Sequence, residues 1–258
     1  MTIHSGALQS RPMRRVVILG ATSGIALEVE RQLARLDCEL FLVARSPQRL
    51  AALQADLIVR GAAQVLTCAA DLASVQRHAA IFDFVGRSFS DFDTVLLAYG
   101  VMHDQKQSET SVDILLDQLH TNYVSAAALL TLFAADLERR HTGCIAAITS
   151  VAGDRGRRSN YIYGSAKGAL SLFLQGLRSR LHPAGVKVIT IKPGPAATPM
   201  TDHLPNAARF ADPALVARDI VRALERRSPD VVYTPRVWRY LMTAVEHIPE
   251  ALFKRLAF

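Results

Sequence analysis

Cysteine and long apolar runs are scarce in this chain of 258 residues. The three cysteines, Cys38, Cys68 and Cys144, are scattered and odd in number, so no disulfide framework or metal-ligand spacing is predicted. We therefore expect a reducing compartment and no metal. The longest apolar run, residues 124–137, is interrupted by polar residues and is too short to cross a bilayer.

Linkers, internal repeats and low-complexity segments are also lacking. Residues 1–13 have no apolar signal core, and we expect a short disordered tail there. Lysine is rare, because 25 of the 30 basic residues are arginine, and the net charge is +7. No nucleic-acid-binding motif accompanies this charge, which favours an anionic ligand or an anionic membrane surface over nucleic acid.

Half of the residues are apolar, and short β-rich runs alternate with amphipathic helical segments. This alternation predicts an α/β fold with a doubly wound parallel sheet, the Rossmann fold. We expect one Rossmann-fold domain over residues 14–233 and an amphipathic extension over residues 234–258. The predicted strands cover residues 15–20, 39–44, 63–68, 94–100, 145–150, 186–192 and 230–233. The predicted helices cover residues 27–36, 48–60, 74–89, 109–140, 161–180 and 213–227.

Three side chains that can act together lie in residues 149–167: Ser150, Tyr163 and Lys167. Tyr163 and Lys167 are four residues apart, so a helix that begins near Tyr161 places them on one face. An ammonium near a phenol favours the phenolate and is expected to lower the tyrosine pKa from about 10. Tyr161 is a weaker candidate, because its partner four residues on is Ser165.

The pattern Ser-x12-Tyr-x3-Lys resembles the active site of the short-chain dehydrogenase/reductase family. The resemblance selects Ser150 over its neighbour Thr149, which would point to the opposite face of a strand. It implies that Tyr163 donates a proton to a ketone, that Ser150 binds the carbonyl oxygen and that Lys167 also binds the nicotinamide ribose. Asn122, 28 residues before Ser150, matches the family's structural and proton-relay asparagine.

A glycine-containing turn between the first strand and the first helix predicts a dinucleotide site. Its glycines let the backbone approach a pyrophosphate, which the following helix N-terminus attracts. The family's third glycine is Ala26 here, one methyl group larger at a helix-packing position. The predicted contacts in the turn are Gly20, Thr22, Ser23, Gly24 and Ile25.

Arg45 follows the second strand where NAD-binding folds carry an acid. This favours NADP(H) over NAD(H); a solvent-exposed loop arginine is the other interpretation. By resemblance, residues further along also bind the cofactor: Asp71 and Leu72 near the adenine, Gly100, and Pro193, Gly194 and Thr198 near the nicotinamide. Residues 97–100 read L-A-Y-G where the family commonly has N-N-A-G, so only the glycine is retained.

The extension mixes aromatic and aliphatic residues with basic ones. Two interpretations fit this composition equally well. One is a helix at a membrane interface, and the other is a C-terminal helix packed on its own domain or across a dimer. This extension and residues 150–167 have a narrower resemblance, to reductases of a keto sugar carried on a polyprenyl phosphate in cell-envelope synthesis. In that case Arg155, Arg157 and Arg158 would meet the phosphate, while Trp238, Leu241, Met242, Leu252 and Phe253 would line an apolar route or enter the bilayer.

The expected activity is thus reduction of a ketone with NADP(H). The alternatives are reduction of a free sugar, acyl or steroid-like ketone, and a non-catalytic NADP(H)-binding regulator. The family likeness of the two long helices implies a homodimer or homotetramer. We expect a cytoplasmic protein, with peripheral contact to the inner face of the plasma membrane through the extension.

Overall fold

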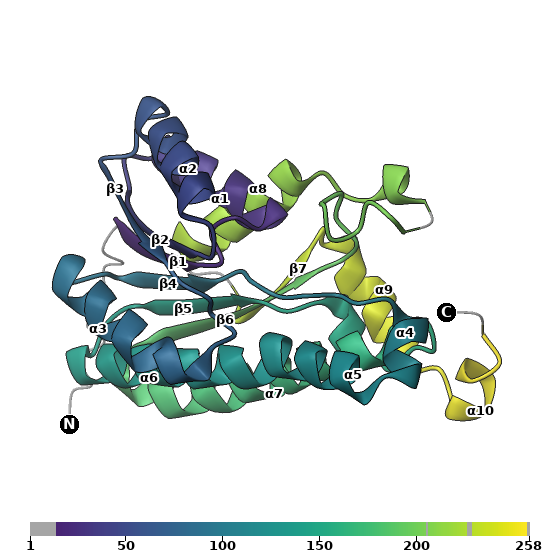
Figure 1. Ribbon diagram of the computed structural model, residues 1–258. Coiled ribbons are helices and arrows are strands. Elements are labelled where there is room, and N and C mark those ends of the chain that lie inside the picture. Colours follow the sequence, from purple (N-terminus) through teal and green to yellow (C-terminus); the bar gives the residue numbers. More distant parts are fainter. Residues whose placement is uncertain (1–13, 205, 226–228, 257–258) are drawn as a thin grey trace, which may run out of the picture.

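A parallel sheet lies at the centre of the molecule (Figure 1). The computed structural model describes residues 14–204, 206–225 and 229–256. The strands are β1 (Arg15–Leu19), β2 (Glu39–Ala44), β3 (Gln64–Ala69), β4 (Thr94–Leu97), β5 (Cys144–Ile148), β6 (Lys187–Pro193) and β7 (Val231–Thr234). Their order is β3-β2-β1-β4-β5-β6-β7. Successive strands are thus added on one side of β1 up to β3 and on its other side from β4 onward, so the strand order reverses between β1 and β4. In such sheets ligands bind beyond the carboxyl ends of the strands at this reversal.

The strands form where the sequence has short apolar runs. Residues 16–19 of β1 and 95–97 of β4 are completely buried, as expected for a parallel sheet that is covered on both faces. The predicted strands agree with the observed ones except at their ends. The fifth strand stops at Ile148, so Thr149 and Ser150 follow the strand rather than belonging to it.

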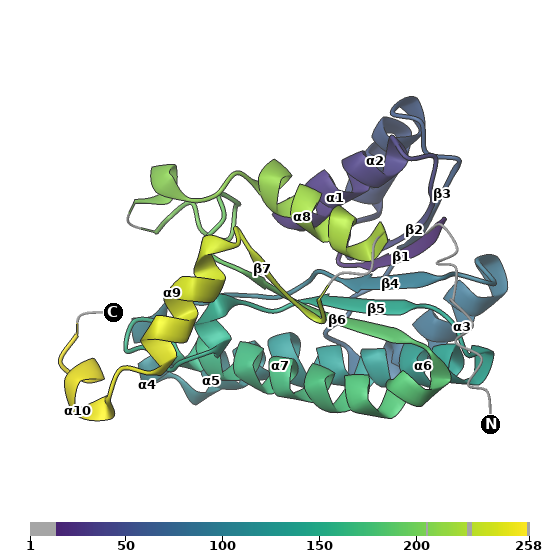
Figure 2. The ribbon, with the colours of Figure 1, turned by 180° about the vertical axis from the view of Figure 1, so that it is seen from behind.

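Helices cover both faces of the sheet, as Figures 1 and 2 show from opposite sides. One face carries α1 (Gly24–Ala34), α2 (Pro47–Val59) and α8 (Pro213–Glu225), and the other carries α3 (His78–Ser88), α6 (Ser125–Arg140) and α7 (Tyr161–Leu181). Each layer encloses its own apolar cluster, one including Leu33 and Ile220 and the other including Phe133 and Leu174. The fold is therefore the predicted doubly wound α/β sandwich.

The long helix predicted over residues 109–140 is present from Val112 onward, with a π-helical turn inside it. The segment contains the end of α4 (Gln105–Thr110), then α5 (Val112–Leu119), a π-helical turn (His120–Val124) and α6. Ser111 has extended backbone angles, φ −133° and ψ 113°, and its hydroxyl accepts a hydrogen bond from the Ile114 amide at 3.4 Å. A serine that caps the following helix in this way competes with helix continuation.

The extension forms α9 (Val237–Glu246) and α10 (Glu250–Phe253); α9 lies beside α4 and the beginning of α7, and α10 lies further out (Figures 1 and 2). Its inner residues form an apolar cluster that includes Met242, Val245 and Phe253. The inner side of the extension therefore packs on its own domain, as one of the interpretations from the sequence predicts. Three predicted parts of the chain lie outside the described residues: the disordered tail at 1–13, the end of the helix predicted over 213–227, and Phe258. No helix that the structure describes is long and apolar enough to span a membrane.

Candidate active site

The predicted catalytic residues meet beyond the carboxyl ends of β4 and β5. The ammonium of Lys167 lies 5.8 Å from the centre of the Tyr163 ring, and the Ser150 side chain is near enough to the Tyr163 hydroxyl to lower its pKa. A Cβ atom added to Gly100 would contact Asn122 Oδ1 and lie 3.2 Å from Lys167 Nζ. Residues that are up to 67 positions apart in the chain thus border one small region.

Ser150 begins a short 3-10 turn, Val151–Gly153, immediately after β5. Its Oγ accepts a hydrogen bond from the Ala152 amide at 3.1 Å, which fixes the side chain beside the turn. The neighbouring Thr149 instead donates its hydroxyl to the Ile191 carbonyl of β6 at 2.9 Å. Of the two adjacent hydroxyls, Thr149 is therefore engaged within the sheet and Ser150 lies against Tyr163.

Tyr163 and Lys167 both lie on the buried side of α7, at 9% and 3% exposure, whereas Tyr161 is 44% exposed. Lys167 Nζ donates a hydrogen bond to the Ile148 carbonyl at 3.2 Å. The helix thus selects between the two tyrosines as the four-residue spacing predicts, because residues four apart share a helix face.

Burial dominates the ionisation of both groups. It raises the pKa of Tyr163 to about 12, although the hydrogen bond with Ser150 lowers it, and it lowers the pKa of Lys167 to about 8. This differs from the lowered tyrosine pKa that the spacing alone predicts. Burying a phenolate costs more free energy than the neighbouring groups recover by stabilising it. Tyr163 is therefore protonated at neutral pH.

Asn122 lies in the π-helical turn between α5 and α6 and is 1% exposed. Its Oδ1 accepts a hydrogen bond from the Val101 amide at 3.1 Å, and its Nδ2 donates to the carbonyls of Val101 at 2.7 Å and Gln118 at 2.9 Å. The side chain therefore joins the segment after β4 to the helix. A π-helical turn at such a position is frequent at functional sites.

The glycine turn has the geometry that a dinucleotide requires. Gly20 has φ +95°, a conformation that side chains rarely adopt, and Ser23 caps α1 by accepting a hydrogen bond from the Ala26 amide. A Cβ atom at Gly24 would lie 2.9 Å from the Thr198 side chain. The turn and the predicted nicotinamide segment thus adjoin each other. The remaining predicted residues of the turn are Thr22, whose carbonyl accepts a hydrogen bond from Arg49, and Ile25, which is partly buried against the core.

The L-A-Y-G segment has its own support in place of the family's asparagines. The Tyr99 hydroxyl is hydrogen-bonded to Ser125 Oγ at 2.7 Å, and Ser125 donates to the Leu72 carbonyl at 2.5 Å. Asp71 is exposed, and its Oδ1 accepts from the Ala73 amide at 3.1 Å. Sequence reasoning missed Tyr99 because only the tertiary structure brings Ser125 to it.

The nicotinamide segment begins where β6 ends, at Pro193. The Gly194 amide donates a hydrogen bond to the Thr234 carbonyl at 3.0 Å, and the Trp238 ring packs directly on Gly194. Trp238 therefore contacts the candidate site itself and does not extend from the domain. The Thr198 amide donates to Thr201 Oγ1 at 3.1 Å, which leaves the segment folded close to the glycine turn.

Glycines allow the Ser150 turn to lie directly on α7. A Cβ atom at Gly164 would lie 2.6 Å from the Ala152 carbonyl oxygen, and one at Gly168 would lie 2.9 Å from that of Gly153. Side chains do not tolerate such distances, so the turn and the helix touch through their backbones. The spacing of these glycines around Tyr163 and Lys167 was a sequence signal for this contact that the motif-based reasoning did not use.

The arrangement fits a nicotinamide dinucleotide. Gly20 to Ile25 and the N-terminus of α1 would hold the pyrophosphate, and Arg45 is exposed at the end of β2. Lys167, Gly194 and Thr198 would border the nicotinamide. These features define a dinucleotide-dependent oxidoreductase of the α/β class. A family model described as short chain dehydrogenase matches residues 14–208, and the chain belongs to this family. It is therefore an NAD(P)-dependent oxidoreductase.

Relatives of similar length share this assignment. The chain is 34% identical over 241 residues to an uncharacterized oxidoreductase of Mycobacterium tuberculosis, covering 93% of this chain and 96% of that protein. It is 33% identical over 247 residues to an uncharacterized oxidoreductase of Streptomyces coelicolor, covering 96% and 97%. A short-chain dehydrogenase from Sphingobium yanoikuyae, solved with NADPH, superposes with a TM-score of 0.79 at 25% identity, covering 92% and 97%. L-sorbose reductase from Gluconobacter frateurii, solved with NADPH and L-sorbose, gives a TM-score of 0.76 at 22% identity, covering 86% and 94%.

The backbone contact between the turn and α7 makes a prediction about glycine substitutions. We expect Gly168→Ala to lower the free energy of unfolding by about 1–3 kcal/mol and to lower kcat, because the added methyl group separates the turn from the helix. The matched control is Gly176→Ala on the same helix, where no atom lies within 4 Å of the added Cβ. Helix propensity favours that change by up to about 1 kcal/mol. Urea unfolding measures both; equal stability of the two variants would contradict the contact.

Proposed function

We propose that the protein reduces a ketone, with the residues that lie around Tyr163 as its catalytic group. The observation that carries this proposal is the meeting of Ser150, Tyr163 and Lys167 beside Gly100. A bound nicotinamide supplies the hydride. Tyr163 donates the proton to the carbonyl oxygen, for which a pKa of about 12 keeps the phenol protonated at neutral pH. Ser150 donates a hydrogen bond to the same oxygen.

Lys167 and Asn122 have supporting roles in this proposal. Burial lowers the pKa of Lys167 to about 8, which brings its proton exchange close to physiological pH. Lys167 binds the nicotinamide ribose and stabilises the phenolate that Tyr163 becomes when it delivers its proton. Asn122 holds the backbone at residue 101 and supports a water that leads to Lys167.

The proposed cofactor is NADP(H), with NAD(H) as the weaker ligand. Arg45 is exposed where β2 ends, with no carboxylate in the ribose position, and it suits a 2′-phosphate. The Sphingobium enzyme and L-sorbose reductase, which share this fold, were both solved with NADPH.

Removal of the Tyr163 hydroxyl tests the mechanism. We expect Tyr163→Phe to lower kcat by about 10²–10⁴-fold and to leave NADPH binding nearly unchanged, because the proton donor is lost while the ring volume is kept. Steady-state kinetics and a fluorescence titration with NADPH measure the two effects. Tyr161→Phe is the matched control and should be mild, since Tyr161 is exposed. Near-normal turnover by Tyr163→Phe would exclude the mechanism, and turnover by the parent would exclude a non-catalytic regulator.

Cofactor preference depends on Arg45. We expect the parent to bind NADPH more tightly than NADH, and Arg45→Ala to remove most of the difference, about 1.5–3 kcal/mol for a charge-assisted hydrogen bond. Calorimetric titration of both reduced cofactors gives the two affinities. Arg60→Ala, at the far end of α2 where Arg60 pairs with Asp56, should leave both affinities unchanged. Equal affinities in the parent would refute the NADP(H) preference.

For the substrate we propose a keto sugar carried on a polyprenyl phosphate. The resemblance of residues 150–167 and of the extension is to decaprenylphosphoryl-2-keto-ribose reductase, which reduces such a sugar in mycobacterial arabinan synthesis. Three arginines are predicted from the sequence to meet the phosphate, but one of them, Arg155, is bound by the extension. This leaves Arg157 and Arg158. Arg157 Nε is buried without a hydrogen-bond partner, and burial lowers the pKa of its guanidinium, so an anion would stabilise it.

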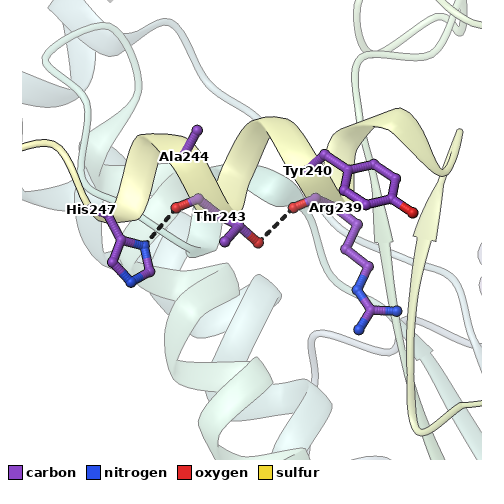
Figure 3. A pocket seen from close by; sticks show the side chains of 5 residues that line it. All are labelled: Arg239, Tyr240, Thr243, Ala244 and His247. Atoms are coloured by element: carbon purple, nitrogen blue, oxygen red, sulfur yellow. Dashed lines mark hydrogen bonds between the residues drawn. The ribbon is translucent and has the colours of Figure 1, made fainter.

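The outer side of α9 supports contact with a lipid. Figure 3 shows Arg239, Tyr240, Thr243 and Ala244 on α9 and His247 just after it, the residues that line a shallow and open surface region. Tyr240 is 76% exposed, and Leu241 and Leu252 are also exposed. Trp238, Met242 and Phe253 pack inward, so they do not line an open route as the sequence predicts. Exposed apolar residues beside Arg236, Arg239, Lys254 and Arg255 suit an anionic membrane surface.

This substrate implies a protein in the cytoplasm that contacts the inner face of the plasma membrane. We also propose a homodimer or homotetramer formed through α5 and α7. The support is three exposed apolar side chains on these helices: Val112 at 70%, Leu116 at 54% and Leu172 at 69% exposure. Contact with a second copy would cover such residues.

A surface variant tests the lipid-linked substrate without unfolding the extension. We expect the double substitution Tyr240→Ser with Leu241→Ser to lower activity on a polyprenyl-phosphate-linked ketone far more than on a short water-soluble ketone. It should also weaken binding to anionic vesicles, because apolar area on the outer side of α9 is lost. The control is Val59→Ser on α2, where the side chain is 88% exposed. Loss of both activities equally, or of neither, would favour a free ketone as the substrate.

A further inference from the structure

Arg155, five residues after Ser150, is bound almost entirely by the extension. Its side chain is 13% exposed, and its Nη2 contacts Glu250 Oε2 at 3.0 Å. The guanidinium carbon lies 3.8 Å from the centre of the Phe253 ring. Nη1 donates to three carbonyls at the end of α9 and beyond, those of Val245 at 2.6 Å, Glu246 at 3.0 Å and Ile248 at 2.6 Å. Carbonyls at a helix C-terminus lack partners within the helix and attract a cation, so Arg155 caps α9.

The turn itself also packs on the extension. Val151, the residue after Ser150, is 2% exposed and belongs to the apolar cluster formed with Met242, Val245 and Phe253. Apolar side chains from both segments are buried against each other, which stabilises the packing of the turn on the extension.

A third contact joins the same loop to the last two strands. The side chain of Asp154 is 1% exposed, pairs with the Lys192 ammonium of β6 and accepts a hydrogen bond from the Tyr233 hydroxyl of β7 at 3.0 Å. The residues after Ser150 are thus held by an apolar contact and a capping arginine, both with the extension, and by a buried ion pair with β6.

The opposite side of the turn lies on α7, through Gly164 and Gly168. Ser150 therefore begins a turn that is enclosed between the helix carrying Tyr163 and the C-terminal extension. The family model ends at residue 208, so this outer support lies outside the segment that defines the family.

We infer that the segment Tyr233 to Phe253 is the outer support of the catalytic turn, and that Arg155 is the positioning residue through which it fixes Ser150 relative to Tyr163. Arg155 acts on the reaction through the backbone of its own loop and does not bind the substrate. Loss of its contacts would let the turn move away from α7, which increases the separation of the Ser150 and Tyr163 hydroxyls. Turnover would fall while the dinucleotide turn, on the other side of β4, would be unaffected.

Arg155→Met tests this inference, since it keeps the apolar stem and removes the guanidinium. We expect amide hydrogen exchange over residues 151–155 to become about tenfold faster or more, with exchange in β1 and α1 unchanged. We expect kcat for 9,10-phenanthrenequinone, an uncharged ketone, to fall by about tenfold or more with little change in its KM or in the Kd for NADPH. Phe253→Leu should produce the same pattern, and Arg155→Lys should recover part of it by keeping the contact with Glu250.

The control is Arg139→Met on α6, which removes an arginine that is 77% exposed and pairs with Asp136. Hydrogen exchange within twofold of this control in Arg155→Met would overturn the inference whether or not the quinone is reduced, so it is independent of the proposed substrate. A rise in KM confined to an anionic ketone, tested with dihydroxyacetone phosphate against dihydroxyacetone, would make Arg155 a substrate-binding residue instead. A parallel loss of NADPH affinity and overall stability would make its role merely structural and would also overturn the inference.

Discussion

The backbone contact between the turn after Ser150 and helix α7 is the constraint on which the candidate site depends. Gly153, Gly164 and Gly168 leave no room for side chains between the two segments. Because Ser150 begins this turn and Tyr163 lies on this helix, their separation is set by main chain rather than by mobile side chains. A hydrogen bond between two hydroxyls tolerates little variation in distance, so such rigidity suits it.

The arrangement buries the ammonium group of a lysine, which is energetically unfavourable. Lys167 is 3% exposed, and its ammonium has one hydrogen bond to a protein carbonyl, that of Ile148, within the described residues. Burial alone lowers its pKa to about 8, and burial raises the pKa of Tyr163 to about 12 against an opposing effect of Ser150. Both shifts destabilise the charged forms in the folded protein, and groups with such shifts concentrate at functional sites. The closely packed surroundings keep the Lys167 side chain buried, although its charged form would be more stable in water.

Much of the fold was predictable because its signals are local. Apolar runs such as residues 16–19 and 94–97 predict buried strands, and their alternation with helices predicts the sandwich. The spacing from Ser150 to Tyr163 and Lys167 likewise located the candidate site. The long helix predicted over residues 109–140 begins only at Val112, because Ser111 caps it, and helix propensity does not reveal this start.

The sequence by itself determined the class of fold, the glycine turn and the set of side chains available for chemistry, since each depends on residues close together in the chain. The tertiary structure decided which partners those side chains have. It directs Arg155 to the end of α9, packs Trp238 on Gly194 and makes burial the dominant influence on Tyr163. These outcomes depend on contacts between segments 40 or more residues apart, and periodicity and spacing carry no information about such contacts.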